Sequence, residues 1–216
     1  MIVDERIVTF INSLDTKNSE LLETIEAEAR AADVPIIRRE MQSFLKVLLM
    51  MKNPKRILEV GTAVGFSALL MIESVSENCH ITTIENYEKR IPIARENFRR
   101  AGKAQQITLI EGDAAEVMKT LGAPYDFIFM DAAKGQYIHY LPDALRLLCD
   151  GGVLVSDNVM QDGDVIQSRF AVERRNRTIH ARMRDYLYEL KHNEELTTSI
   201  IPYYFFSFYH HIYFLQ

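Results

Sequence analysis

The chain has 216 residues, 48% hydrophobic and 25% charged, which is typical of a globular protein with one substantial core. Its formal net charge of −5 gives no overall attraction to nucleic acid or membrane, so any polyanion contact must be local. It lacks an uncharged apolar run of roughly 20 residues, the length of a membrane span, and Met1–Arg6 do not resemble a signal peptide. Cys79 and Cys149 lie in or beside apolar stretches, which predicts a cytoplasmic protein with reduced thiols and no membrane partner.

Three helices are expected at the N-terminal end of the chain. Apolar residues recur at helical spacing over 3–13, 17–32 and 39–51. Pro35 separates the last two, because the residue before a proline avoids helical geometry. Within a single predicted domain, 1–216, we treat residues 1–52 as an N-terminal helical cap.

Strands and helices then alternate along the chain. The expected strands are Arg56–Val60, His80–Glu85, Gln106–Glu111, Asp126–Met130 and Gly152–Ser156. The expected helices between them are Ser67–Ser76, Tyr87–Ala101, Ala114–Leu121 and Ile138–Leu148. This alternation predicts an α/β fold with a mostly parallel sheet flanked by helices, and residues 53–160 form its core. A long helix over 167–192 and two antiparallel edge strands within 197–214 complete the last part, 161–216.

Polar residues follow two of the predicted buried strands. Asp131 comes directly after Phe127–Met130, and Asp157 and Asn158 come after Gly152–Ser156. The carboxyl ends of parallel strands line the ligand crevice of such sheets. Two carboxylates and an amide provide the oxygen ligands that Mg²⁺ prefers. Lys134, three residues after Asp131, is a candidate proton acceptor.

A second group of residues is typical of a nucleotide site. Gly61 and Gly65 form a turn between a strand and a helix, which either admits a ligand or is only a tight turn. Glu59 would repel a phosphate and suits a cationic ligand. Glu85 ends the second strand, where an acidic side chain can bind a ribose diol. Asp113 follows the third strand and either binds an adenine amino group or caps the next helix.

With these residues, the chain resembles class I S-adenosylmethionine (SAM)-dependent methyltransferases, and more narrowly the metal-dependent O-methyltransferases that act on catechol and caffeoyl-CoA. The segments that carry the resemblance are ILEVGTAVGFSA, ITTIE, EGDA, YDFIFMDAAKGQY and GGVLVSDNV. Within that family it looks most similar to bacterial tRNA 5-hydroxyuridine methyltransferases, through VPII, DAAKGQY and an arginine-rich stretch after DNV. The resemblance implies a Rossmann-like fold with a seven-stranded sheet.

The family's roles carry over to matching positions. SAM would be held by the backbone near Ile37 and by Ser67, Glu85, Asp113 and Ala114. Glu59 and Gly61 would line the amino-acid end of SAM, and Asp131 would touch both SAM and the metal. Asp131, Asp157 and Asn158 would bind Mg²⁺ or another divalent cation.

The implied reaction transfers a methyl group to one of two adjacent substrate oxygens that the metal chelates. Asp131 and Lys134 would be the catalytic residues. Lys134 would take the hydroxyl proton, unless the metal alone acidifies the substrate and the lysine only neutralises the carboxylates. Members of the family are commonly homodimers.

The substrate depends on an arginine-rich stretch outside these motifs. Residues 169–184 hold six arginines and one acid, and Arg177, His180 and Arg184 share one helical stripe. We expect Arg174, Arg175, Arg177 and Arg184 to bind the anticodon region of tRNA, because arginine suits phosphate and base contacts. The alternative is a solvated helix face.

Three functions remain open from the sequence. The first is methylation of 5-hydroxyuridine to 5-methoxyuridine at the tRNA wobble position, where the 5-hydroxyl and 4-carbonyl are adjacent oxygens. The second is methylation of a small catechol or caffeoyl-type phenol. The third, a nucleotide-binding protein without catalysis, has no need of the metal trio and Lys134.

The C-terminal segment departs from the family pattern. Eight of the twelve residues 203–214 are aromatic, and no glycine is present to form a tight hairpin. The segment is a divergent edge strand, an aromatic interface between subunits, or the product of an altered reading frame.

Overall fold

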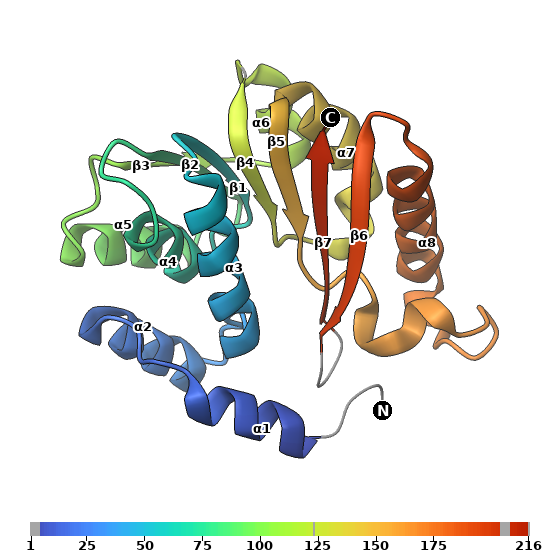
Figure 1. Ribbon diagram of the computed structural model, residues 1–216, viewed down its shortest axis with the longest axis horizontal. Coiled ribbons are helices and arrows are strands. Elements are labelled where there is room, and N and C mark those ends of the chain that lie inside the picture. Colours follow the sequence, from blue (N-terminus) through green and yellow to red (C-terminus); the bar gives the residue numbers. More distant parts are fainter. Residues whose placement is uncertain (1–4, 123, 204–207, 216) are drawn as a thin grey trace.

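The computed structural model describes residues 5–122, 124–203 and 208–215. Its strands lie in one sheet in the order β3-β2-β1-β4-β5-β7-β6 (Figure 1). Strands β1 to β5 pair in parallel, β5 pairs antiparallel with β7, and β7 pairs antiparallel with β6. The strand bounds are β1 Arg56–Val60, β2 His80–Glu85, β3 Ile107–Glu111, β4 Tyr125–Met130, β5 Leu148–Ser156, β6 Leu196–Tyr203 and β7 Phe208–Leu215. The predicted parallel α/β architecture is confirmed.

Helices cover both faces of the sheet. Their bounds are α1 Glu5–Leu14, α2 Glu20–Ala31, α3 Arg39–Lys52, α4 Phe66–Glu73, α5 Ile91–Arg100, α6 Ala114–Thr120, α7 Tyr137–Leu147 and α8 Arg177–His192. Short 3₁₀ helices are η1 Lys134–Gln136, η2 Gln161–Ile166 and η3 Arg174–Asn176. Figure 1 shows α2 and α3 on the side of α4 and α5, whereas α7 and α8 lie on the other side of the sheet.

Alternation along each strand divides the core into two layers. In β1, Ile57 packs with α2, α3, α4 and α5, whereas Leu58 and Val60 pack with α6, α7 and α8. The same division holds in β4, where Phe127 faces the first layer and Ile128 the second. Because both faces are covered, the central strands read as nearly continuous apolar sequences.

The largest correction concerns the helix expected over 167–192. Helix α8 begins only at Arg177, and η3 and an irregular segment precede it. The apolar stripe that anchors the helix starts late, with Met183, Tyr186 and Leu190 buried. The preceding residues instead turn back, and the side chain of Arg177 donates hydrogen bonds to the carbonyls of Val172 and Phe170. The position of the buried apolar side chains therefore determines that α8 starts at Arg177, whereas helical propensity alone predicted a start at residue 167.

Other boundaries differ by a few residues, each for a local reason. Helix α2 starts at Glu20 because Ser19 caps it through the Leu22 N–H. Helix α5 starts at Ile91, with a proline in its first turn, and not at residue 87. Strand β5 starts at Leu148, four residues earlier than predicted.

Several expectations concern the membrane, the thiols and the C-terminal end. Within 5–122, 124–203 and 208–215, no helix has both the length and the apolar character that a membrane span requires. Cys79 and Cys149 are free thiols. The antiparallel pairing expected for the last two strands is present in β6 and β7. Residues 204–207, where the hairpin turn was in doubt, lie outside the described residues.

Candidate active site

A cavity of about 440 Å³ opens at the carboxyl edge of the parallel strands. Its wall is formed by the segment before α3 and by the loops that follow β1 to β5. Most of the predicted site residues line it: Ile37, Gly61, Ser67, Glu85, Ala114, Asp131, Lys134, Asp157 and Asn158. Glu59 and Asp113 do not form the wall, but they contact or adjoin residues that do. The topology thus brings together positions that lie up to 121 residues apart, from Ile37 to Asn158.

The predicted metal trio lies at the adjacent ends of β4 and β5. Asp157 is buried, with 3% of the residue exposed, and its backbone N–H donates to the Met130 carbonyl at 2.9 Å. Asn158 has a φ of 61°, a left-handed conformation that is uncommon for a residue other than glycine. Its Oδ1 is buried and accepts no hydrogen bond from the residues that the structure describes. A buried polar oxygen of this kind and a strained backbone are both typical of a functional site.

The electrostatics of the trio also favour a cation. Burial and then repulsion from Asp157 raise the pKa of Asp131 to about 7, whereas nearby Lys134 opposes the shift. The carboxylates of Asp131 and Asp157 repel each other when both are ionised, and a positive charge between them relieves the repulsion. The donor set of two carboxylates and one amide is therefore suited to a hard divalent cation such as Mg²⁺.

The glycine turn after β1 is required by packing as well as by any ligand. Gly61 has a φ of 104°, and a Cβ at this position would lie 2.1 Å from the backbone carbonyl oxygen of Asp131. A Cβ at Gly65, where φ is 83°, would collide with the ring of Phe98. Gly61 therefore lets the first loop lie directly against the backbone of Asp131, a predicted metal ligand. The sequence offered a tight turn and a ligand site as alternatives, and this loop forms both a tight turn and part of the cavity wall.

Glu59 is a completely buried acid behind the cavity wall. The hydroxyl of Ser67 donates to its Oε1 at 2.6 Å, and the hydroxyl of Thr83 donates to its Oε2. Burial raises the pKa of Glu59 to about 8, although both hydrogen bonds act to lower it. Ser67, predicted to contact the cofactor, therefore also has a structural role, because its hydroxyl fixes the Glu59 carboxyl group.

Glu85 organises the loop that follows β2. One carboxylate oxygen accepts the N–H of Ala63 at 2.7 Å, and the other accepts the N–H groups of Asn86 and Tyr87. These bonds fix the carboxylate at the rim of the cavity. A carboxylate has about four acceptor positions, so one remains for a ligand hydroxyl.

Two other predicted cofactor residues have local roles as well. Asp113 caps α6 by accepting the Ala115 N–H at 2.9 Å, which was one of its two predicted roles. Its neighbours Gly112 and Ala114 line the cavity. The carbonyl of Ile37 accepts a hydrogen bond from the Gln42 side chain at 2.9 Å.

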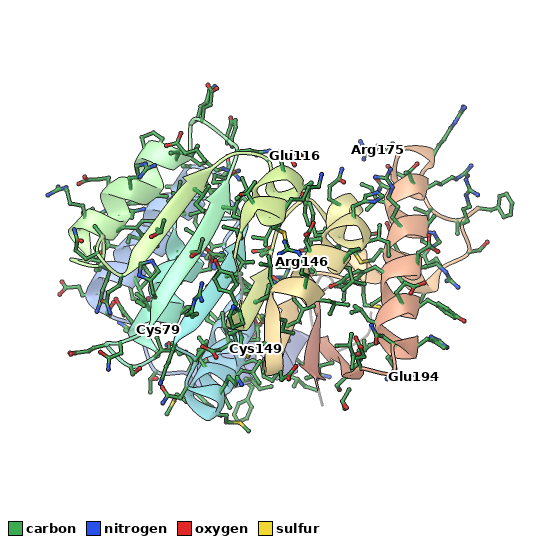
Figure 2. All side chains as sticks on the ribbon, turned by 90° about the horizontal axis from the view of Figure 1, so that it is seen from above. Cys79, Glu116, Arg146, Cys149, Arg175 and Glu194 are labelled. Atoms are coloured by element: carbon green, nitrogen blue, oxygen red, sulfur yellow. The ribbon has the colours of Figure 1, made fainter. Side chains whose placement is uncertain are left out.

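The six arginines of residues 169–184 divide into two groups. Three arginines of α8 donate to backbone carbonyls: Arg177 to Val172, Arg182 to Gly135, and Arg184 to Val165. Arg169, Arg174 and Arg175 are exposed on the segment before the helix, beside Phe170, which is 85% exposed. Arg175 forms a surface ion pair with Glu173. Figure 2 shows Arg175 and Glu194 at opposite ends of α8.

The stripe of Arg177, His180 and Arg184 thus faces its own chain. His180 Nε2 lies 3.2 Å from the Gln167 carbonyl, so all three side chains hold the segment 165–172 against α8. Arg174 and Arg175 keep the exposure that contact with a polyanion requires.

The sequence did not single out several residues of this site. Tyr87, Arg90 and Tyr140 line the cavity, with the Arg90 guanidinium 5.3 Å from the centre of the Tyr87 ring. Tyr87 follows Glu85 at the carboxyl end of β2, and this position was the available signal. Tyr137 does not line the cavity, but its hydroxyl forms hydrogen bonds with backbone groups of Met130, Ala132 and Asp157. No signal in the sequence pointed to it, because only the fold brings these groups together.

Comparison with known proteins supports this arrangement. Residues 12–203 match the model of a protein family described as O-methyltransferase. A catechol O-methyltransferase of Mycobacterium tuberculosis is 32% identical over 160 residues, which is 73% of each chain. A Staphylococcus aureus crystal structure, of a candidate caffeoyl-CoA O-methyltransferase, is 30% identical with a TM-score of 0.88, covering 99% of this chain and 100% of that one. An O-methyltransferase of Bacillus cereus, crystallised in complex with SAH, shares the fold: TM-score 0.87, 22% identity, and coverage of 98% and 97%.

Proposed function

This chain belongs to the O-methyltransferase family, and we propose that it methylates one of two adjacent oxygens with SAM as the methyl donor and Mg²⁺ as the metal. The first proposed substrate is 5-hydroxyuridine at the wobble position of tRNA. The observation that carries the proposal is that Asp131, Asp157, Asn158, Lys134 and Glu85 line one cavity. A SAM site, a metal site and a candidate base would all lie in this cavity, a combination that a nucleotide-binding protein without catalysis would not need.

The cavity assigns separate tasks to its two halves. SAM supplies an activated methyl group, and Glu85 would hold its ribose through the acceptor position that the backbone leaves open. Glu59, with Ser67, lies behind the end of the cavity where the amino-acid part of SAM would bind, next to its cationic sulfonium. A volume of about 440 Å³ is in the usual range for small-molecule sites, roughly 300–1,000 Å³.

The other half would bind the substrate. Asp131, Asp157 and Asn158 would hold the divalent cation, which would lower the pKa of a substrate hydroxyl and orient the two adjacent substrate oxygens. Lys134 lies at the start of η1, close enough to Asp131 to influence its pKa, and in its neutral amine form would accept the hydroxyl proton. Fixing nucleophile and methyl group in line removes about 7–11 kcal/mol of the barrier in well-aligned systems.

Two substrate classes fit the same donor set. Exposed Arg169, Arg174 and Arg175, with exposed Phe170 among them, support RNA, because arginine binds phosphate and an aromatic side chain stacks on unpaired bases. The similarity to a catechol O-methyltransferase supports the second candidate, a small phenol with adjacent oxygens.

Transfer of labelled methyl groups from SAM into tRNA and into catechol separates these candidates. We expect labelling of tRNA that falls steeply with salt, because phosphate contacts release counterions. The double variant Arg174→Gln/Arg175→Gln should lose about tenfold in activity on tRNA, which corresponds to roughly 0.7 kcal/mol for each of the two exposed contacts. Neither the added salt nor the double variant should affect the rate of reaction with a small phenol.

The matched control removes two other exposed, ion-paired arginines, Arg95 and Arg99 of α5, and should leave tRNA labelling unchanged. Labelling of catechol with none of tRNA would contradict the RNA substrate and establish the phenol. Labelling of neither would contradict both.

A further inference from the structure

Tyr137 is a fully buried residue at the first position of α7. Its hydroxyl oxygen accepts the N–H of Ala132 at 3.2 Å. The hydroxyl proton faces two carbonyl oxygens, that of Met130 at 3.1 Å and that of Asp157 at 3.2 Å. Burial raises the pKa of Tyr137 well above its ordinary value, so the phenol keeps the proton that it donates.

The partners of this hydroxyl define its significance. Met130 and Ala132 are the two neighbours of Asp131, and Asp157 is itself one of the trio. The Tyr137 side chain therefore fixes the backbone on both sides of Asp131 and also the backbone of Asp157, and both of these residues are predicted metal ligands. The Asp157 N–H bond to the Met130 carbonyl crosses the same gap between the ends of β4 and β5.

This link joins the ends of two neighbouring strands. Asp131 directly follows β4 and Asp157 directly follows β5, so the spacing of their side chains depends on how these two strand ends are held together. Groups that position metal ligands without touching the metal affect its affinity, because a small displacement of a ligand weakens metal binding. Loss of such a group typically lowers the metal affinity by a factor of 10–100.

We propose that Tyr137 is a positioning residue for the divalent cation, holding Asp131 and Asp157 at the spacing that the cation needs. The inference rests on the proposed metal site of the preceding section. It concerns a residue that touches neither the cation nor the substrate, so its effect must reach the cation through the backbone of β4 and β5.

The test measures Mn²⁺ binding directly, by electron paramagnetic resonance of the free ion, with the full-length protein saturated with SAH. Tyr137→Phe should weaken Mn²⁺ binding by about 10–100-fold. Affinity for SAH in the absence of metal should change less than threefold, which shows that the variant is folded.

Tyr186→Phe is a matched control. Tyr186 is equally buried and lies edge-on to Tyr137 at 5.6 Å, but its hydroxyl bonds the Ser156 side chain at 2.6 Å. This control should lower thermal stability yet leave Mn²⁺ affinity within about threefold of wild type. Equal weakening in both variants would mean a general packing effect and would overturn the proposal.

A milder change keeps the test decisive if Tyr137→Phe does not fold. Replacing Ala132 by lactic acid exchanges the N–H that the Tyr137 oxygen accepts for an ester oxygen, and should weaken Mn²⁺ binding in the same direction. Wild-type Mn²⁺ affinity in a folded variant of either kind overturns the inference and leaves the proposed function intact. Failure of the wild-type protein itself to bind Mn²⁺ overturns both.

Discussion

Asn158 combines two features that rarely occur together by chance. Its backbone is left-handed, and its buried side-chain oxygen accepts no hydrogen bond from the described residues. Strain and burial of an amide oxygen each cost about 1–3 kcal/mol. A ligand bound by this oxygen would offset both penalties, and the neighbouring carboxylates agree with the proposal that this ligand is a cation.

Asn158→Gly separates stability from metal binding. Glycine adopts a φ of 61° without strain and removes the unsatisfied amide, so metal-free stability should stay within about 1 kcal/mol of wild type or increase. The rise in Tm that Mg²⁺ produces in the wild-type protein should be lost, and EDTA should no longer lower the Tm. Differential scanning fluorimetry with and without Mg²⁺ measures both effects.

Asn53→Gly is the control for this substitution. Asn53 has a similar φ of 45° at the end of α3 and takes no part in the cavity. It should keep the full response to Mg²⁺. A Mg²⁺ response in Asn158→Gly equal to that of wild type would remove Asn158 from the metal site.

At the scale of elements, α8 acts as a clamp on the loops that flank the cavity. Its inward stripe holds the segment 165–172, and Arg182 donates to the Gly135 carbonyl in η1, one residue after Lys134. The basic stripe that suggested an RNA surface therefore partly serves the fold.

Removing one donor of the clamp should loosen its segment. Arg184→Met keeps the apolar stem but loses the bond to the Val165 carbonyl, 2.9 Å in length. A charged hydrogen bond contributes about 1.5–3 kcal/mol, so amides of residues 165–171 should exchange roughly tenfold faster or more. Hydrogen exchange with mass spectrometry reports this directly.

Lys191→Met provides the comparison. Lys191 lies on the same helix and also donates to a backbone carbonyl, that of Thr198 in β6, at 2.9 Å. Exchange in 165–171 should be unaffected by this change. Equal protection of the segment in Arg184→Met and wild type would show that the stripe does not clamp it.

For the whole molecule, two acids of the ligand-free site make the free energy of unfolding depend on pH. The folded state becomes less stable as pH rises. The pKa of Glu59 is raised to about 8 and that of Asp131 to about 7, so the folded state holds protons that the unfolded chain releases. The stabilisation from these protons is complete below the ordinary carboxyl pKa of about 4. It is lost as pH rises to about 7–8, with a slope of about 1.4 kcal/mol per pH unit for each proton held only by the folded state.

Glu59→Gln tests this linkage. The amide cannot titrate, so the fall in the free energy of unfolding between pH 5.5 and 8 should be smaller by about one proton's slope. Urea unfolding at several pH values, with a constant m-value, measures it. Glu88→Gln, which changes an exposed carboxyl group, should follow the wild-type curve, and identical slopes in Glu59→Gln and wild type would refute the role of Glu59.

The parallel α/β architecture and the meeting of polar residues at its carboxyl edge could both be predicted from the amino-acid sequence. Strand–helix alternation is a local pattern, and the polar residues at the strand ends, Asp131 and Asp157, must meet at one edge once the strands are parallel. For the same reason Gly61, Glu85 and Lys134 could be assigned to that edge before their contacts were known.

Only the tertiary structure decided what these residues touch. The start of α8 depends on which side chains are buried, the Arg184 bond joins positions 19 residues apart, and Tyr137 gathers backbone groups from two strands. Such partners are chosen by proximity in space, which periodicity along the chain does not encode. The sequence thus indicated that the polar residues at the strand ends share one edge, and packing decided which other residues line the cavity and how firmly each group is held there.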